Sequence, residues 1–310
     1  MTSQTFDRMP PMGQAWLRAL RGKPGLAPGG TVPRIEARVA VAHADPRWVG
    51  RFGRVTGTAI EGRLPATAPQ ALALPVQMAV LTAPEFPLPL LGAVHVRQRI
   101  DVLAPIPLDG RMTIDCSVEG ARHARRGVEV DLITEIDVHG KPAWRAVTTF
   151  LSRGKGAPGE GKGGADQARG ATSEGGAEAA APSGSDAVVP PADPSVSAIW
   201  RLPEDLGRRF AAVAGDRNPI HIHALTARPF GFKQPIIHGM WTLARSLASL
   251  DLASPTAPTR IECRFLKPLP LPGSARLVGW RDGDVSTFQV FDGKGRLALV
   301  GSVALLPQGG

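Results

Sequence analysis

Apolar positions near the C-terminal end of the chain follow a helical period. Within residues 239–250 four of them recur at spacings of three and four, which predicts a helix with one apolar face. These positions are Met240, Leu243, Leu247 and Leu250. A corresponding helix is expected over residues 71–81. The stretches after each helix, separated by Gly and Pro, predict strands over residues 94–103, 111–119, 127–138 and 144–151, and over 260–266, 275–280, 285–292 and 297–306.

The two halves of the chain contain the same short patterns. Phe-x-x-Val-x-Gly begins at Phe52 and again at Phe210, 158 positions later. Leu-x-Pro-x-Pro-Leu-x-Gly begins at Leu103 and again at Leu266, 163 positions later. Two matches in the same order favour a duplication. A helix followed by an antiparallel sheet, twice over, predicts an α+β fold in which each sheet wraps around its helix.

A change in composition divides the two copies. Residues 154–187 contain no Val, Ile, Leu, Met or aromatic residue, so this stretch cannot bury a core and is expected to be a flexible linker. The predicted organisation is an N-terminal extension over 1–29, a first repeat over 30–153, a Gly/Ala/Pro-rich linker over 154–195 and a second repeat over 196–310.

The amino-acid composition limits the classes of partner that this protein is expected to bind. The formal charge of +9 favours an anionic partner without naming one. Aromatic residues make up 5 % and Tyr is absent, so the stacking surfaces of a single-strand nucleic-acid binder are scarce. Cys116 and Cys263 are too few for a disulfide framework and form no metal-binding pair. Because no signal peptide and no run of roughly 18 apolar residues is present, we expect a cytoplasmic protein without membrane or nucleic-acid partners.

The strongest local signal is a pair of segments in the second half. Residues 214–223 read AGDRNPIHIH and residues 230–240 read FGFKQPIIHGM. The Gly-Asp-x-Asn-Pro-x-His and Pro-Ile-x-His-Gly-Met elements resemble the hydratase motif of the MaoC-like R-specific enoyl-CoA hydratases and acyl dehydratases. Since the duplication is similar to that of the double hot-dog members, the resemblance implies a double hot-dog fold over most of residues 40–307.

The resemblance implies (R)-specific hydration of trans-2-enoyl-CoA, or dehydration of 3-hydroxyacyl-CoA, with Asp216 and His221 as the catalytic pair. A carboxylate and an imidazole five positions apart around a Pro-stiffened turn can converge on one water. Hydration takes one proton from water and gives one to C2, and which residue does which stays open. By resemblance, Gly239 supplies the backbone N–H that binds the thioester oxygen. An amide at the start of a helix has no partner inside the helix, and glycine lets the thioester approach the backbone closely.

Other polar and flexible residues near the motif are candidates for substrate contacts. They are Asn218, Met240, Arg260, Arg264 and Lys267. The amide is expected mainly to brace its loop through backbone hydrogen bonds, the thioether to line an acyl tunnel, and the three cations to meet coenzyme A phosphates. His223 and His238 stay open between a structural and a chemical role. The resemblance implies no metal and no redox cofactor, and coenzyme A enters as part of the substrate.

The first copy lacks the motif. An offset of 158 carries the catalytic pair back to Thr58 and Arg63, and the expected helix there has no His-Gly at its start. We therefore expect the first repeat to be catalytically silent, and the resemblance to double hot-dog hydratases implies that it helps to shape the acyl pocket.

Two alternatives stay open. The chain could be a 3-hydroxyacyl-[acyl-carrier-protein] dehydratase that uses the same residues, or a non-catalytic acyl-thioester binding protein. The expected partner is an acyl-CoA thioester, with acyl carrier protein as the alternative. Two repeats already make a pseudo-dimer, and the sequence leaves open whether two chains form a homodimer.

Overall fold

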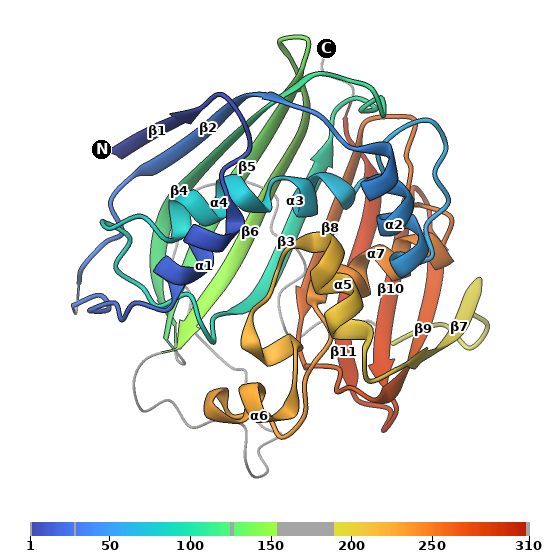
Figure 1. Cartoon of the computed structure of the whole chain (residues 1–310). Coiled ribbons are helices and arrows are strands. Elements are labelled where there is room, and N and C mark those ends of the chain that lie inside the picture. The colour runs from blue at the N-terminus through green and yellow to red at the C-terminus, as the bar shows by residue number, and fades with distance from the viewer. Residues whose placement is uncertain (1, 28, 125–126, 154–188, 308–310) are drawn as a thin grey trace.

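The computed structural model describes residues 2–27, 29–124, 127–153 and 189–307. In these residues eleven strands form one continuous sheet with the order β1-β2-β4-β5-β6-β3-β8-β11-β10-β9-β7 (Figure 1). The strands are β1 (Thr2–Phe6), β2 (Ile35–Ala42), β3 (Val94–Val102), β4 (Met112–Ala124), β5 (Gly127–Val138), β6 (Lys141–Arg153), β7 (Val196–Leu202), β8 (Thr259–Phe265), β9 (Gly273–Asp282), β10 (Val285–Asp292) and β11 (Leu297–Leu305).

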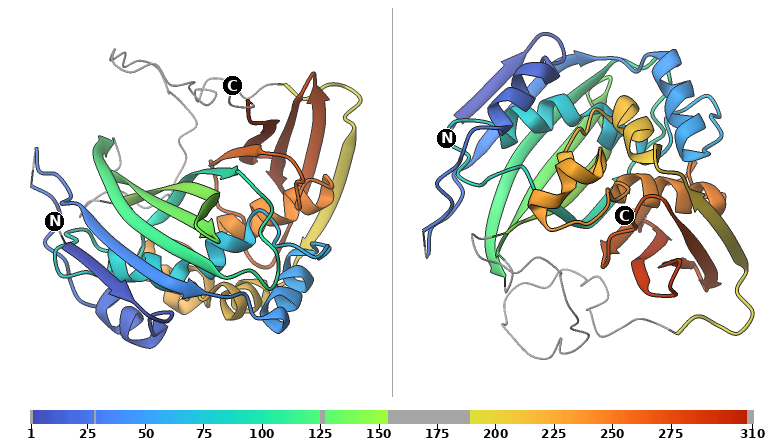
Figure 2. Two further views of the ribbon diagram at one scale, coloured as in Figure 1. Left: turned by 90° about the horizontal axis from the view of Figure 1, so that it is seen from above. Right: turned by 60° about the horizontal axis from the view of Figure 1, so that its bottom comes forward.

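The helices that form the core lie on one side of this sheet. Figure 1 shows α3, α4 and α7 in front of it, and the view from above in Figure 2 shows the sheet curving around them. The described helices are α1 (Met12–Ala19), α2 (Pro46–Thr56), α3 (Ala68–Leu72), α4 (Leu74–Leu81), α5 (Leu206–Ala214), α6 (Ala224–Ala227) and α7 (Gly239–Ser249), with short 3-10 turns η1 (Pro219–His221) and η2 (Arg228–Phe230).

The two halves of the sheet meet at β3 and β8. These strands pair antiparallel, with Ile100 opposite Ile261 and Asp101 opposite Arg260. On one side of the junction lie β2, β4, β5, β6 and β3, and on the other β8, β11, β10, β9 and β7. Pairing the two halves covers an edge that each would otherwise expose. The predicted α+β double hot-dog fold is confirmed.

The first repeated pattern marks the end of a helix in each half. Phe52 and Phe210 are buried on α2 and α5, and their ring centroids lie 6.4 Å apart. Gly57 and Gly215 end these helices in the left-handed conformation, with φ of 73° and 78°. A side chain at this φ is strained, so glycine is the residue that lets the chain turn there.

The second repeated pattern marks where each central strand ends. The N–H of Leu103 donates to the carbonyl of Ala143 at 2.8 Å, and that of Leu266 donates to the carbonyl of Ala298 at 2.8 Å. The two copies therefore leave β3 and β8 by equivalent turns, as a duplication predicts.

Several elements differ from the sequence expectations. The first-half helix is two pieces, α3 and α4, and Pro75 stands in the first turn of α4, where proline is tolerated. Strands β2 and β7 and helices α2 and α5 were not predicted. In α7, Leu243 and Leu247 are fully buried, as expected of its apolar face.

The segments outside the repeats are partly described. Strand β1 pairs parallel with β2 at one edge of the sheet, so part of the N-terminal extension belongs to the fold. The linker predicted over 154–195 falls mostly outside the described residues. Nowhere in the described part of the chain is a helix both long enough and apolar enough to cross a membrane.

Candidate active site

Asp216 stands directly after α5, where the left-handed Gly215 turns the chain out of the helix. One carboxylate oxygen, Oδ1, accepts a hydrogen bond from the backbone N–H of Asn218 at 3.1 Å. The side chain is 37 % exposed, and the residue lines a cavity. The turn therefore fixes one oxygen and leaves the carboxylate beside open space.

Asn218 and Pro219 set the next turn. The side-chain oxygen Oδ1 of Asn218 accepts from the N–H of Ile220 at 3.5 Å and caps the 3-10 turn η1, which ends at His221. Proline fixes φ at the first position of this turn. Asn218 also lines the cavity. Its main interactions in this structure are with the backbone of its own loop.

His221 is 8 % exposed and held in one orientation. Its Nδ1 lies 2.7 Å from the carbonyl oxygen of Ile236. Because a carbonyl oxygen only accepts, Nδ1 carries the proton and Nε2 keeps a lone pair. Burial lowers the pKa of His221, and the Asp216 carboxylate and the Ile236 carbonyl offset part of that shift. The ring is thus neutral near pH 7, with Nε2 able to accept a proton.

His238 packs against His221 and braces the Asp216 turn. The two rings stack with centroids 3.7 Å apart and planes inclined by 23°. The Nε2–H of His238 donates to the backbone carbonyl of Asp216 at 3.0 Å, while among the described residues its buried Nδ1 has no hydrogen-bond partner. Burial and the adjacent His221 ring lower the pKa of His238 to about 3. These contacts give His238 a structural role; His223 instead caps α6 by accepting from the N–H of Leu225 at 3.2 Å.

Gly239 begins helix α7 at the cavity. The first amides of a helix have no partner inside it and carry the positive end of the helix dipole. A Cβ on Gly239 would come within 2.8 Å of the Phe265 ring. The absent side chain therefore lets the strand β8 aromatic lie against this amide.

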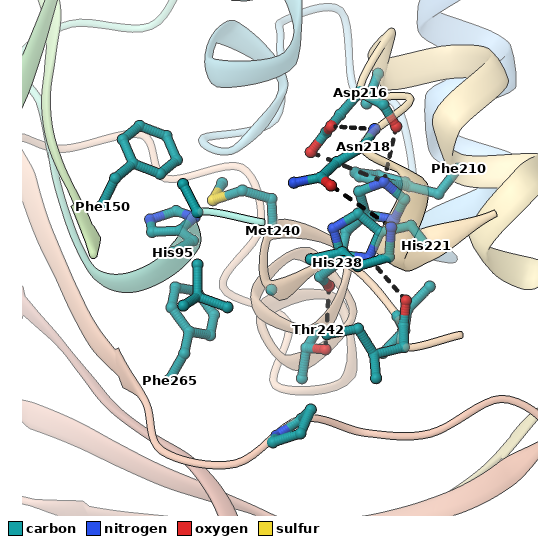
Figure 3. A pocket seen from close by; sticks show the side chains of 18 of the residues that line it. His95, Phe150, Phe210, Asp216, Asn218, His221, His238, Met240, Thr242 and Phe265 are labelled. Carbon is teal, nitrogen blue, oxygen red and sulfur yellow. Dashed lines mark hydrogen bonds and ion pairs between the residues drawn. The ribbon is translucent and has the colours of Figure 1, made fainter. Parts of the chain in front are cut away.

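A cavity of about 250 Å³ connects these residues to the N-terminal repeat. Figure 3 shows Asp216, Asn218, His221 and His238 on one side, Met240 beside them, and His95, Phe150 and Phe265 across the open space. The N-terminal repeat lines the cavity with helix residues Gln70, Leu74, Gln77 and Met78. Acid/base groups thus stand at one end of a mostly apolar chamber that both repeats build.

His95 lines the cavity and was missed by the sequence analysis. Its Nε2–H donates to the carbonyl of Arg97 at 2.9 Å, and its ring lies 4.7 Å from that of Phe265 and 5.4 Å from that of Phe150. Burial lowers the pKa of His95 to about 4. A lone histidine in a predicted strand carries no signal that its partners come from β6 and β8, because those contacts need the sheet order.

The structure places two of the predicted cations outside the cavity lining. On β8, Ile261, Cys263 and Phe265 alternate with Arg260 and Arg264, so the arginines face away from the helices and the cavity. Arg260 is paired with Asp101 at 2.7 Å, and neither arginine lines the cavity.

Two other predicted contacts do line the cavity. Lys267, which follows β8 and is exposed, is among its lining residues, and so is Met240.

The equivalents of the catalytic pair in the first repeat lie elsewhere. The Thr58 hydroxyl lies 2.9 Å from that of Thr56, and Arg63 pairs with Glu61 at 3.2 Å. Neither lines the cavity.

Asp216, His221 and His238 also form a group of ligating atoms within 4.8 Å of one another. A metal bound by two imidazoles lies in the plane of both rings. Because these rings stack nearly parallel, no point at bonding distance from both nitrogens lies in both planes. As arranged here, the group does not fit a metal shared by the two histidines.

Comparisons with known proteins agree with this fold and identify the family. Residues 189–301 match the family model described as MaoC like domain. The 3-hydroxyacyl-thioester dehydratase X of Mycobacterium tuberculosis is 34 % identical over 262 residues, which cover 84 % of this chain and 86 % of that protein.

Solved structures are similar to this chain over most of its length. The crystal structure of HtdX from Mycobacterium tuberculosis matches with a TM-score of 0.71 and 30 % identity, over 87 % of this chain and all of that one. A MaoC-like dehydratase from Phytophthora capsici, 19 % identical, shares the fold with a TM-score of 0.63 over 89 % of this chain and 95 % of its own. The family resemblance of the motif is therefore confirmed, and the chain belongs to the MaoC-like dehydratases.

Proposed function

We propose that this chain adds water to trans-2-enoyl-CoA thioesters and, in reverse, dehydrates (R)-3-hydroxyacyl-CoA, with Asp216 and His221 acting through one water. The observation that carries the proposal is that a His221 ring nitrogen lies within 4.8 Å of an Asp216 carboxylate oxygen in the cavity lining, while Nδ1 donates to the Ile236 carbonyl and leaves Nε2 as an acceptor. The dehydratase family and the name of the mycobacterial relative support the coarser reaction, the interconversion of 3-hydroxyacyl and enoyl thioesters.

The proposed reaction needs two proton transfers. The water oxygen forms a bond to C3 as a water O–H bond breaks, and a proton forms a bond to C2 as the C2–C3 double bond becomes single. Nε2 of neutral His221 and the Asp216 carboxylate are both acceptors that can hold and relay that proton. No net proton is gained or lost, so the pair returns to its starting state.

Charge that develops on the thioester oxygen needs a fixed donor. The Gly239 amide at the positive end of α7 is the candidate. The Phe265 ring lies beside this glycine and Met240 lines the cavity, so the surroundings of the thioester oxygen are apolar, which strengthens a hydrogen bond from the amide. The amide and the His221–Asp216 pair then act on opposite ends of the same conjugated thioester.

Coenzyme A is the proposed carrier because Lys267 is an exposed cation on the cavity wall and the net charge is +9. A cation at the cavity entrance can meet the phosphates of coenzyme A. Acyl carrier protein presents the same phosphopantetheine arm, so a comparison of carriers is part of the test.

The test is the loss of enoyl-thioester absorbance with purified protein and a series from crotonyl-CoA to trans-2-hexadecenoyl-CoA, with chiral analysis of the product. We expect turnover and an R product. Faster turnover of the matched carrier-protein thioesters would assign the carrier instead to acyl carrier protein. Binding of acyl-CoA without turnover of any thioester would contradict the proposal and favour a binding protein.

A further inference from the structure

The N-terminal helix α1 reaches the candidate active site. Ala15 and Ala19 on α1 form a small apolar cluster with Met78 of α4, and Leu74, Leu90 and Leu91 pack against it. Figure 1 shows α1 beside α4, on the same side of the sheet. The N-terminal extension therefore packs against α4, which lines the part of the cavity that the N-terminal repeat forms.

Trp16 joins this helix to the Asp216 turn. Its indole Nε1–H donates to the carbonyl oxygen of Gly215 at 3.2 Å. That carbonyl belongs to the residue before Asp216, at the end of α5, where helix carbonyls lack partners inside the helix. Met12, one turn earlier on α1, lies against the same glycine. Helix α1 thus holds the point from which the Asp216 turn departs.

The Trp16 side chain also forms part of the cavity wall. It lines the cavity together with Leu74, Met78 and Leu90, all of which pack against the α1 cluster. Trp16 therefore lies both at the base of the Asp216 turn and in the part of the cavity wall that the N-terminal repeat supplies.

A second tryptophan offers a matched comparison. Trp48 on α2 donates its indole N–H to the carbonyl of Val213 at 2.8 Å, also at the end of α5. It packs on Phe52 with ring centroids 5.7 Å apart, but it does not line the cavity. The two indoles hold the same end of one helix, and only Trp16 also faces the substrate space.

We propose that Trp16 is a specificity and positioning residue: its ring forms part of the wall of the acyl cavity and limits the room for the acyl chain, and its indole N–H positions the Asp216 turn. The inference rests on the proposed function, and it deepens that function by assigning the limit of acyl length to a residue outside both repeats. It predicts that ring size at position 16 sets which enoyl thioesters are accepted.

The first experiment compares Trp16→Ala, Trp16→Phe and Trp48→Phe on the enoyl-CoA series. In Trp16→Ala we expect the preferred acyl chain to lengthen, because the wall is removed. Trp16→Phe keeps the wall and loses the donor, so the length preference stays while kcat falls about threefold to tenfold with little change in KM. Trp48→Phe is expected to lower the melting temperature while keeping kcat and length preference near wild type.

The second experiment needs no turnover. Saturated dodecanoyl-CoA, which cannot be hydrated, is titrated while tryptophan fluorescence is followed. We expect quenching in wild type and Trp48→Phe, and a much smaller change in Trp16→Phe. If enoyl thioesters are not hydrated but this difference in quenching is seen, the proposed hydration is contradicted and the placement of Trp16 in the cavity wall is supported.

Two results overturn the inference. One is a folded Trp16→Ala variant with the wild-type length preference. The other is equal quenching in Trp16→Phe and wild type, or no quenching in any of the three proteins.

Discussion

The two repeats use the same scaffold and treat their polar atoms differently. After Gly57, the Thr58 hydroxyl lies 2.9 Å from the Thr56 hydroxyl, and Arg63 is paired with Glu61. After Gly215, the equivalent turn brings the Asp216 carboxylate to the cavity edge and is followed by His221 with a free Nε2.

The central helices show the same contrast. At α3, the Gln70 amide donates to the Thr148 hydroxyl at 3.0 Å, inside the N-terminal repeat. At α7, Gly239 starts the helix at the cavity with an amide that has no partner in the helix. The duplication therefore teaches that one fold can carry different polar groups. The second copy brings the Asp216 carboxylate, the His221 imidazole and the start of α7 to the cavity, whereas the first copy lines it with helix residues such as Gln70, whose buried Oε1 has no hydrogen-bond partner among the described residues.

The largest expected effect is on the acid/base pair. Asp216→Asn and His221→Ala should each lower kcat by about 100-fold to 10,000-fold, because a positioned acid or base is lost. The matched changes in the first copy, Thr58→Val and Arg63→Ala, should leave kcat within about threefold. Initial rates with the best enoyl-CoA measure both, and circular dichroism checks folding. A loss of turnover in the Thr58 or Arg63 variants equal to that of the pair would break the contrast between the copies.

A smaller loss is expected at the start of α7. The Cβ of Gly239→Ala would meet the Phe265 ring at 2.8 Å, so the amide must shift, and kcat should fall about tenfold to 100-fold. Phe265→Leu in the same chain should recover part of the lost stability, since it makes room. The control is Gly50→Ala on α2, where a Cβ meets only the Arg54 side chain at 3.6 Å. Wild-type kcat in Gly239→Ala would remove the proposed oxyanion contact.

The pH dependence sharpens the role of His221. Burial lowers the pKa of His221 below the ordinary histidine value of 6.5, so the acceptor Nε2 persists below that pH and is lost when the ring takes up a proton. We expect kcat/KM to stay level through pH 6.5 and to fall about tenfold per pH unit at a lower pH. Asp216→Asn should move this acidic fall of kcat/KM to a still lower pH, because the Asp216 charge raises the pKa of His221. An acidic limb above pH 6.5 contradicts the assignment.

The smallest expected effect is a difference between Phe52 and Phe210, which occupy equivalent positions in the two repeats. Phe52 and Phe210 are both buried, and Phe→Leu at either should cost on the order of 1 kcal/mol in the free energy of unfolding. Phe210 also packs on His238, with ring centroids 5.0 Å apart, so Phe210→Leu should lower kcat further than Phe52→Leu. Denaturant unfolding and initial rates give the two quantities. Equal kcat losses would mean that the His238 contact does not support the site.

The sequence predicted the parts of the molecule that local pattern controls. The α7 period, the duplicated patterns and the spacing of Asp216, His221 and Gly239 are all local. Helix α2 was missed although Val49 and Phe52 have helical spacing, because Gly50 and Gly53 weaken its propensity. The α3–α4 break was missed because Pro75 is tolerated in a first turn.

Contacts across the sheet could not be predicted in the same way. Trp16 lies 199 positions from its acceptor Gly215, and His95 meets Phe150 and Phe265 only through strand order. Arg264 lies outside the cavity for a reason the sequence did contain: Phe265 faces the cavity, and neighbouring strand residues point to opposite faces.

The most direct test of the central claim is a single-turnover comparison of Asp216→Asn, His221→Ala and the double variant at saturating enzyme. If both groups act on one water, the second change should add little, and the double variant should be within about tenfold of the slower single variant. Losses that multiply, or turnover near wild type in either single variant, would contradict a shared water between Asp216 and His221.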